Sequence, residues 1–318
     1  MQEQTVVITG GTGFIGSHLA ERLVEMGKKV VIFDNCAEHD LYEETKELLE
    51  KKKDSVRYVQ GDVRDKEAVE AAIKGAEIVY HLAALLGTSA RFGQEKLTVE
   101  VNVLGTLNVL QAALDAGVKY FIHPPRPALT QWLTPYIISK TAQTLFTDMY
   151  HRAYGLPTIG LNIQNCYGPR ERSVLRADTR RPGEGRKLVA TCIMAALKNE
   201  PLPIFGDGSQ SSDFVYIDDV VDALVRAQTD AAVGHVMDIG TGISTPVKRV
   251  AELIIELTGS KSKIEYLPMR TGEVKVHTKA DLSGAKQLIG WEPTTSLEEG
   301  LRKTIPYYAR LLGVPSPV

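Results

Sequence analysis

The sequence has few cysteines, no marked excess of either charge and no long uninterrupted hydrophobic run. Its three cysteines, Cys36, Cys166 and Cys192, lack the spacing of metal ligands and cannot all pair, which indicates reduced thiols, no metal site and a cytoplasmic location. The 37 basic and 39 acidic residues leave a net charge of −2, which gives no field that would attract nucleic acid. No apolar run reaches the roughly 20 residues of a membrane span, and no signal segment is recognisable at the N-terminus. We therefore expect no nucleic-acid partner and no membrane association.

What the sequence does contain is an alternation of short apolar runs and helical patterns along its first half. Its 318 residues suffice for two packed lobes, and its 43% hydrophobic and 24% charged residues are typical of a globular protein. Helical patterns include a charged, exposed segment over 38–53 and a longer one over 95–116. The apolar runs predict six strands, near residues 6–8, 28–33, 56–60, 77–81, 119–123 and 158–163.

A glycine-rich turn separates the first predicted strand from the helix that follows it, within the stretch TVVITGGTGFIGSH at 5–18. Such glycines let the chain turn with positive φ, let backbone N–H groups approach a phosphate and let the helix pack close to the strand. An ordinary turn between a strand and a helix also favours glycine, but the order of strand, turn and helix predicts a dinucleotide at the helix N-terminus. The residues expected to hold it are Gly10, Gly13, Phe14, Ile15 and Gly16.

Acidic residues follow the next two predicted strands. Asp34, beside Asn35, lies about 20 residues past the glycines, where a carboxylate binds the adenosine ribose hydroxyls and repels a 2′-phosphate. This position favours NAD over NADP, against the alternative of a simple turn. Asp62, beside Val63, is a candidate acceptor for the adenine amino group, with capping and turn roles nearly as well supported. Asp65 is expected to cap the helix that runs through residue 73.

The fourth predicted strand opens into Leu82, Ala83 and Ala84, whose small residues permit a close approach of the cofactor. His81, at the end of that strand, is more typical of a satisfied core histidine than of a catalytic one. Asn102 lies within the predicted helix among apolar neighbours, where bracing of adjoining backbone and no special role are equally supported.

Tyr136 and Lys140 are four residues apart and therefore share a face on a helix. A nearby ammonium favours the phenolate, which can take a proton from a hydroxyl group near neutral pH. Pairs at this spacing are also common on helix surfaces, but the position after five strands of a nucleotide-binding pattern favours catalysis.

The second half of the chain offers weaker signals. Asn165 lies at the carboxyl end of the sixth strand, where doubly wound sheets bind ligands. The basic segment 171–186 fits a phosphorylated substrate or a solvated surface equally well. Asp218 or Asp219 is expected to cap a further helix, and the run 235–239 is expected to return to the main sheet.

Together these features closely resemble the extended short-chain dehydrogenase/reductases, specifically the NAD-dependent epimerase/dehydratase family acting on nucleotide sugars. The resemblance runs nearly end to end. It rests on the glycine turn, on Asp34 and on a series of short motifs. In the first half of the chain these motifs are Gly61-Asp62-Val63, His81 to Ala84, Asn102-Val103-Leu104-Gly105-Thr106 and Tyr136-x-x-x-Lys140. In the second half they are Tyr167-Gly168-Pro169-Arg170, Phe205-Gly206-Asp207-Gly208, Asp213-Phe214-Val215-Tyr216, Arg270-x-Gly272-Glu273 and Gly290-Trp291-x-Pro293.

The resemblance implies an α/β fold: a Rossmann-type doubly wound sheet of seven parallel strands that holds NAD, and a smaller mixed α/β C-terminal lobe over the substrate. We expect residues 1–167 to form the NAD-binding domain, to which the chain returns at about 214–240. The substrate-binding lobe would comprise residues 168–213 and 241–318. The resemblance also implies a homodimer, built as a four-helix bundle on the helices near 97–116 and 135–153.

The implied activity is 4-epimerisation of a nucleotide sugar, a UDP-sugar above all. Tyr136 would remove a sugar hydroxyl proton while a hydride passes to NAD, and Lys140 would stabilise the phenolate and hold the nicotinamide ribose. The resulting 4-keto sugar would turn over in the site before the hydride returns to its other face. Asn102 joins the cofactor contacts, and the implied substrate contacts are Thr88, Asn165, Arg170 and Arg270.

The sequence also departs from the family. Most relatives end the fifth strand in a Ser/Thr cluster that bonds the reacting oxygen, whereas this chain has His123, Pro124 and Pro125. Thr130, Thr134, His123 or water would have to supply the donor, and losing one such donor costs on the order of 10²-fold or more in rate. The acidic pair of the dehydratases is absent, which argues against 4,6-dehydration. Two expected phosphate-binding arginines are replaced by Asn162 and Ser212, for which Arg170, Arg172, Arg176, Arg180 or Arg181 could compensate.

Two alternatives to epimerisation follow from these departures. One keeps the oxidation but changes its outcome, as in decarboxylation of a UDP-uronic acid or net sugar oxidoreduction. The other is an NAD-binding relative with impaired catalysis, which the loss of the hydroxyl favours and the intact Tyr136 and Lys140 oppose.

Overall fold

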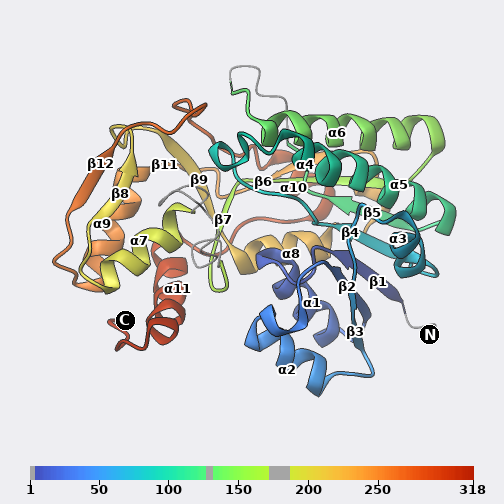
Figure 1. Ribbon diagram of the computed structural model, residues 1–318, viewed down its shortest axis with the longest axis horizontal. Coiled ribbons are helices and arrows are strands. Elements are labelled where there is room, and N and C mark those ends of the chain that lie inside the picture. The colour runs from blue at the N-terminus through green and yellow to red at the C-terminus, as the bar shows by residue number, and fades with distance from the viewer. Residues whose placement is uncertain (1–3, 127–131, 172–186) are drawn as a thin grey trace.

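A seven-stranded parallel sheet forms the centre of the larger part of the molecule in the computed structural model, which describes residues 4–126, 132–171 and 187–318 (Figure 1). Every strand pairs in parallel with its neighbours, in the order β10-β6-β5-β4-β1-β2-β3. The strands are β1 (Thr5–Thr9), β2 (Lys29–Asp34), β3 (Val56–Gln60), β4 (Ile78–His81), β5 (Tyr120–His123), β6 (Thr158–Ile163) and β10 (Val236–Ile239). The expected doubly wound sheet, including the return of the chain at 235–239, is confirmed.

Helices cover both faces of this sheet because its central strands are apolar on both sides. In β1, Val6 and Ile8 face one hydrophobic core, whereas Val7 faces the other. One face packs against α1 (Phe14–Glu25) and α8 (Ile217–Arg226), and the opposite face packs against α3 (Lys66–Ile73), α5 (Gly105–Ala116) and α6 (Pro135–Tyr154) (Figure 1).

The long predicted helix over 95–116 contains an irregularity that the sequence does not announce. It consists of α4 (Glu95–Val99), a π-helical turn (Glu100–Leu104) and α5. By length and composition alone the stretch Glu95–Ala116 could cross a membrane, with a mean hydropathy of 1.3, yet half of it is buried inside the protein. Since α5 packs against α3 and α6, contacts within the fold account for the buried half of this stretch.

A smaller mixed unit lies beside the main sheet (Figure 1). It contains a three-stranded sheet in the order β11-β9-β7 and a parallel pair formed by β12 and β8. The single hydrophobic core on the α1 side of the main sheet continues into this unit. Its elements are β7 (Asn165–Tyr167), α7 (Leu188–Leu197), β8 (Leu202–Phe205), β9 (Ser211–Tyr216), β11 (Ser244–Pro246), α9 (Val247–Thr258), β12 (Ile264–Leu267) and α11 (Leu297–Leu312). Two further helices are α2 (Glu43–Lys51) and α10 (Ser283–Ile289).

Two local expectations need correction. The charged segment 38–53 is not one helix: a 3-10 turn at Glu38–Asp40 precedes α2, because the buried Leu41 separates them. Neither Asp218 nor Asp219 caps α8, whose N-cap is Tyr216. The Asp219 carboxylate instead accepts hydrogen bonds from the Thr294 and Thr295 segment that precedes α11. The expected cap of α3 by Asp65 is confirmed, since its side chain accepts from the Ala68 N–H.

Asp213, in β9, joins the two sheets. Its side chain is fully buried, and its carboxylate accepts hydrogen bonds from the Thr241 N–H and hydroxyl at 2.7 Å each, from the Gly242 N–H at 2.8 Å and from the Ala280 N–H at 3.1 Å. Residues 241 and 242 follow β10, so this carboxylate fastens the end of the main sheet to the smaller unit.

Candidate active site

The strand order reverses between β1 and β4, and this switch point places the candidate site. In an open parallel sheet, the loops at the carboxyl ends of the strands on either side of such a point enclose a ligand crevice. The glycine turn follows β1, and Leu82 to Ala84 follow β4. The two loops contact each other directly, because the Leu82 N–H donates to the Thr9 carbonyl and the Ala83 N–H donates to the Thr9 hydroxyl.

The glycine turn leaves no room for side chains on its inner side. A Cβ on Gly10, whose φ is +71°, would lie 2.6 Å from the Ala83 nitrogen, and a Cβ on Gly16 would lie 2.4 Å from the Gly10 carbonyl oxygen. Gly13 is the N-cap of α1 and no side chain caps this helix. The first-turn N–H groups of Phe14, Ile15 and Gly16 therefore remain available for an anion, as a dinucleotide pyrophosphate requires.

Asp34 lies at the end of β2 and its carboxylate holds the glycine turn in place. One oxygen accepts from the Thr12 N–H at 3.0 Å and the other from the Cys36 N–H at 3.2 Å. An ionised carboxylate has about four acceptor sites, so acceptor capacity remains for ribose hydroxyls. The structure thus fits the predicted role of Asp34.

Asp62 is engaged by Arg64, and its predicted contact with adenine stays a prediction. Its carboxylate accepts from the Arg64 side chain at 2.8 and 3.0 Å and from the Arg64 N–H at 2.9 Å. The hydrogen bond from the Arg64 side chain, with a smaller one from Asn35, holds the pKa of Asp62 below its ordinary value. Asn35 and Asp62 therefore lie together, next to the buried Val63.

His81 is a satisfied core histidine, as its position suggested. Its Nδ1 lies 2.7 Å from the Thr9 hydroxyl and its Nε2 lies 2.8 Å from the Thr106 hydroxyl. Burial, and after it the charge of Lys140, lowers the pKa of His81 to about 3. The ring is therefore neutral at physiological pH and takes no part in proton transfer.

Asn102 braces adjoining backbone, which decides the question that the sequence left open. Its fully buried side chain accepts from the Leu85 N–H at 2.7 Å and donates to the Leu85 carbonyl at 3.1 Å and to the Ser139 hydroxyl at 3.0 Å. It projects from the π-helical turn, an irregularity that is frequent at functional sites. Asn102 thus joins the loop after β4 to α6.

Tyr136 and Lys140 lie one helical turn apart near the start of α6, as predicted. Tyr136 is half-buried, whereas Lys140 is 4% exposed. The Lys140 ammonium donates to the Gln143 side-chain oxygen, a contact that the sequence analysis missed. Burial, and after it the nearby positive charge of Arg126, lowers the pKa of Lys140 to about 7.

This lowered pKa makes a prediction about stability. The unfolded chain binds a proton at Lys140 up to about pH 10, whereas the folded chain releases it above about pH 7, so the penalty for burying the ammonium is fully present below pH 7. We expect Lys140→Met to raise the free energy of unfolding of the NAD-free protein by on the order of 3 kcal/mol at pH 6, and by much less at pH 10. Urea unfolding at both pH values measures the difference.

The exposed Lys74→Met is the matched control for this experiment and should keep the pH dependence of the wild-type protein. An equal gain in stability at pH 6 and pH 10 for Lys140→Met would contradict the prediction, because the effect would then come from packing alone.

The described residues directly after β5, Pro124 to Arg126, carry no hydroxyl group. His123 is 3% exposed, its Nδ1 has no hydrogen-bond partner, and burial lowers its pKa well below the ordinary value. The Thr134 hydroxyl is fully buried and accepts from the Ile137 N–H as the N-cap of α6. Another candidate proposed from the sequence, Thr130, lies outside the described residues. Neither His123 nor Thr134 therefore replaces the hydroxyl group that is missing at Pro124 and Pro125.

Two of the predicted substrate residues meet across the two parts of the chain. The Thr88 hydroxyl, in the loop after β4, donates to the Glu273 carboxylate at 2.9 Å. Glu273 also pairs with Arg270 at 2.6 Å, and the Arg270 guanidinium stacks over Phe205 at 4.7 Å from the ring centre. Asn165 lies half-buried in β7, paired with β9. Sequence reasoning missed Glu273, although it belongs to the quoted motif around Arg270.

The prediction for Arg170 needs correction. Its φ of +69° turns the chain toward α1, where the guanidinium pairs with Glu21 at 2.8 Å and lies 3.9 Å from Glu44. Only 10% of its side chain is exposed, so it is a structural cation and not a free phosphate ligand. Asn162 likewise bonds the Asp238 carboxylate at 2.8 Å. The other compensating arginines proposed from the sequence, at 172, 176, 180 and 181, lie outside the described residues.

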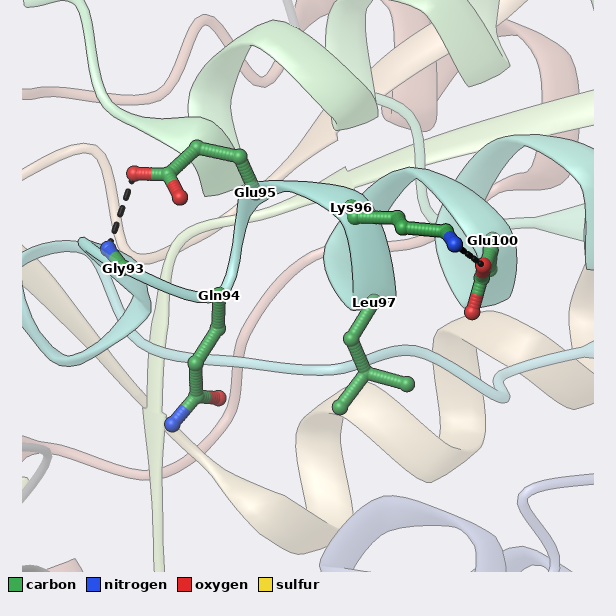
Figure 2. A pocket seen from close by; sticks show the side chains of 6 residues that line it. All are labelled: Gly93, Gln94, Glu95, Lys96, Leu97 and Glu100. Carbon is green, nitrogen blue, oxygen red and sulfur yellow. Dashed lines mark hydrogen bonds and ion pairs between the residues drawn. The ribbon is translucent and has the colours of Figure 1, made fainter.

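One open hollow on the described surface lies away from this chemistry. It has a volume of about 460 Å³, and Figure 2 shows it at the start of α4. None of the predicted site residues lines it. Its lining residues are Gly93, Gln94, Glu95, Lys96, Leu97 and Glu100. This open surface hollow is not a candidate for the active site.

Comparison with known proteins identifies the family of the chain. Residues 7–124 match the family described as GDP-mannose 4,6 dehydratase, and residues 126–240 match the NAD dependent epimerase/dehydratase family. The chain is 31% identical to a UDP-glucose 4-epimerase of Mycolicibacterium smegmatis, over 95% of this chain and 97% of that protein. It is 29% identical to a UDP-N-acetyl-alpha-D-glucosaminuronate decarboxylase of Bacillus cytotoxicus, over 96% of this chain and 98% of that protein.

Among solved structures, the UDP-glucose 4-epimerase of Thermotoga maritima with UDP-glucose superposes with a TM-score of 0.85 at 30% identity, covering 97% of this chain and 100% of that one. Relatives of this chain thus include both UDP-sugar 4-epimerases and UDP-sugar decarboxylases. Together with the glycine turn, Asp34 and the Tyr136–Lys140 pair, these similarities show that the chain belongs to the NAD-dependent epimerase/dehydratase family, with NAD as its cofactor.

Proposed function

We propose that the protein is a UDP-sugar 4-epimerase that works through a transient 4-keto sugar. The observation that carries this proposal is the Tyr136–Lys140 pair on α6, with a half-buried phenol one turn from a buried ammonium. Relatives that cover nearly the whole chain support it, because they include UDP-glucose 4-epimerases.

In this proposal Tyr136 takes the proton of the sugar 4-hydroxyl as the alcohol is oxidised. The positive charge of Lys140 favours the phenolate form of Tyr136, and Tyr136 returns the proton when the ketone is reduced. Bound NAD would supply reversible acceptance of a hydride from the sugar carbon. Its site comprises the uncapped start of α1 and the Asp34 carboxylate. Asn102 keeps the loop after β4 in register with α6 and so helps to orient the reactants.

The direct test is to incubate the NAD-loaded protein with UDP-glucose, UDP-glucuronate and their N-acetylated counterparts and to follow the products by NMR. Conversion to the 4-epimer is the expected result. Loss of carbon dioxide from a uronate would establish the decarboxylase alternative, and no turnover of any sugar by protein with bound NAD would establish impaired catalysis.

We also propose that the protein is a cytoplasmic homodimer that buries the helices of the 95–116 stretch and α6. On α6, Leu145 is 65% exposed and Met149 is 36% exposed, and Leu104 on the other stretch is 51% exposed. Large apolar side chains gathered on two adjacent helices are typical of a subunit interface. None of the three cysteines, all of which the structure describes, forms a disulfide, in keeping with a reducing compartment.

The double variant Leu145→Glu/Met149→Glu is expected to convert the dimer into a monomer, because it places four new charges at the core of a twofold interface. Size-exclusion chromatography with light scattering measures the mass. Tyr266→Glu, an exposed apolar position on β12, is the control and should stay dimeric. A wild-type protein that is monomeric throughout would remove this proposal.

A further inference from the structure

Arg126 lies against the face of α6 that carries the catalytic pair. Its N–H donates to the Thr144 hydroxyl at 3.1 Å, and the same hydroxyl donates to the Lys140 carbonyl at 2.8 Å. Tyr136, Lys140 and Thr144 follow one another at four-residue spacing and therefore share one face of the helix. The chain after β5 is thus fastened beside the residues expected to perform proton transfer.

The charge of Arg126 has no counterpart within the described residues. No described carboxylate forms an ion pair with its half-buried guanidinium, whereas Arg270 and Arg170 are both paired with glutamates. Lys140 likewise contacts an amide oxygen, that of Gln143, and no carboxylate. The sequence over 127–131 contains no acidic residue. Among the residues that the structure describes, these two cationic side chains therefore share a partly dehydrated site without a neutralising anion, and such charges favour an anionic ligand.

The position of Arg126 indicates which part of the ligand carries the anion. If Tyr136 deprotonates a sugar hydroxyl, the part of the ligand beside α6 is the sugar ring. The diphosphate has a separate candidate partner in Arg270, which belongs to the smaller unit and meets the loop after β4 through Glu273. The planar fork of an arginine matches a carboxylate with two parallel hydrogen bonds, and a sugar carboxylate is the group that offers this geometry.

We propose, resting on the proposed function, that Arg126 binds the carboxylate of a UDP-uronic acid, so that the protein selects acidic UDP-sugars over neutral UDP-hexoses. Arg126 directly follows the positions of the family hydroxyl cluster, where Pro124 and Pro125 offer no side-chain donor. Two prolines without a hydroxyl are thus followed directly by the arginine proposed as the carboxylate ligand. A neutral sugar would leave the guanidinium unpaired.

The test is calorimetric binding of UDP-glucuronate, UDP-glucose and UDP to the NAD-loaded protein. We expect the wild-type protein to bind UDP-glucuronate at least about 10-fold more tightly than UDP-glucose, since a hydrogen-bonded charge pair contributes that much or more. Arg126→Gln should weaken the binding of UDP-glucuronate by about 10- to 100-fold and change the affinities for UDP-glucose and UDP by less than about 3-fold. Arg126→Lys should bind UDP-glucuronate with an affinity between those of the wild-type protein and Arg126→Gln, because it keeps the charge and loses the planar fork of the guanidinium.

Arg152→Gln, an exposed arginine on the same helix, is the matched control and should bind all three ligands like the wild-type protein. An equal loss for UDP-glucuronate, UDP-glucose and UDP in Arg126→Gln would place the guanidinium on the diphosphate and overturn the proposal. Equal affinity of the wild-type protein for the two sugars would overturn it as well. NMR turnover assays of the same samples report separately on epimerisation, so binding without turnover would contradict the proposed function and leave the carboxylate site standing.

Discussion

Tyr136→Phe lowers kcat by about 10²- to 10⁴-fold and leaves the amount of bound NAD unchanged: this is the result expected if Tyr136 transfers the sugar proton. The substitution keeps the aromatic ring that packs at the start of α6 and removes only the hydroxyl. That hydroxyl has no hydrogen-bond partner among the described residues, so its loss leaves no buried group unsatisfied. The effect should therefore fall on kcat, with little change in KM.

The measurements are steady-state epimerisation by NMR and NAD released on denaturation, quantified by chromatography. Tyr154→Phe removes a phenol hydroxyl from the exposed end of the same helix and should retain full activity. A fully active Tyr136→Phe would show that another group carries the proton. Loss of NAD together with activity would show that Tyr136 holds the cofactor instead.

Asp213→Ala is expected to lower the free energy of unfolding by about 3–5 kcal/mol, the largest stability effect predicted for the described residues. Its buried carboxylate accepts four hydrogen bonds from Thr241, Gly242 and Ala280, and three of them come from backbone N–H groups. Alanine would leave those donors buried without partners in the segment that joins β10 to the smaller unit. The cost exceeds the net value of the bonds because the donors lose water as well.

Urea unfolding of the wild-type protein, Asp213→Ala and Asp213→Asn measures this effect through the midpoint and the m value. Asp213→Asn keeps the shape of the side chain and one acceptor oxygen, so it should lower the free energy of unfolding by roughly half as much as Asp213→Ala. Asp207→Ala removes an exposed carboxylate paired with Lys275 at 2.6 Å, and it should change stability far less than Asp213→Ala does. If Asp213→Ala and Asp207→Ala lowered the free energy of unfolding equally, burial of the Asp213 network would not be what stabilises this junction.

Much of the fold could be predicted from the sequence because its signals are local. The β-branched runs at Val6-Val7-Ile8 and in the later strands, with glycine at the first turn, specify buried parallel strands in order. The spacing of Tyr136 and Lys140 similarly gives their shared face. Asp65 as a cap is equally local, since its partner is only three residues away.

What could not be predicted depends on contacts between distant segments. Thr88 and Glu273 are separated by 185 positions, and nothing near either residue announces their hydrogen bond. The ion pair of Arg170 with Glu21 depends on a positive φ that the sequence around Pro169 does not reveal. Arg126 shows the same limit, because the sequence indicates the loss of the hydroxyls but not which remaining group lies against α6.

The Asn102 side chain links two segments of the candidate site, the loop after β4 and α6. Its amide pairs with both the N–H and the carbonyl of Leu85, as a neighbouring peptide group would in a β-ladder, and its remaining N–H reaches Ser139. The side chain of Asn102 therefore bonds the backbone of the loop after β4 as a β-strand neighbour would, and it also bonds the helix that carries Tyr136. One buried amide therefore joins the loop expected to face the cofactor to the helix expected to face the sugar. If NAD and the sugar bind as proposed, this link would fix the spacing of hydride acceptor and base before either ligand arrives.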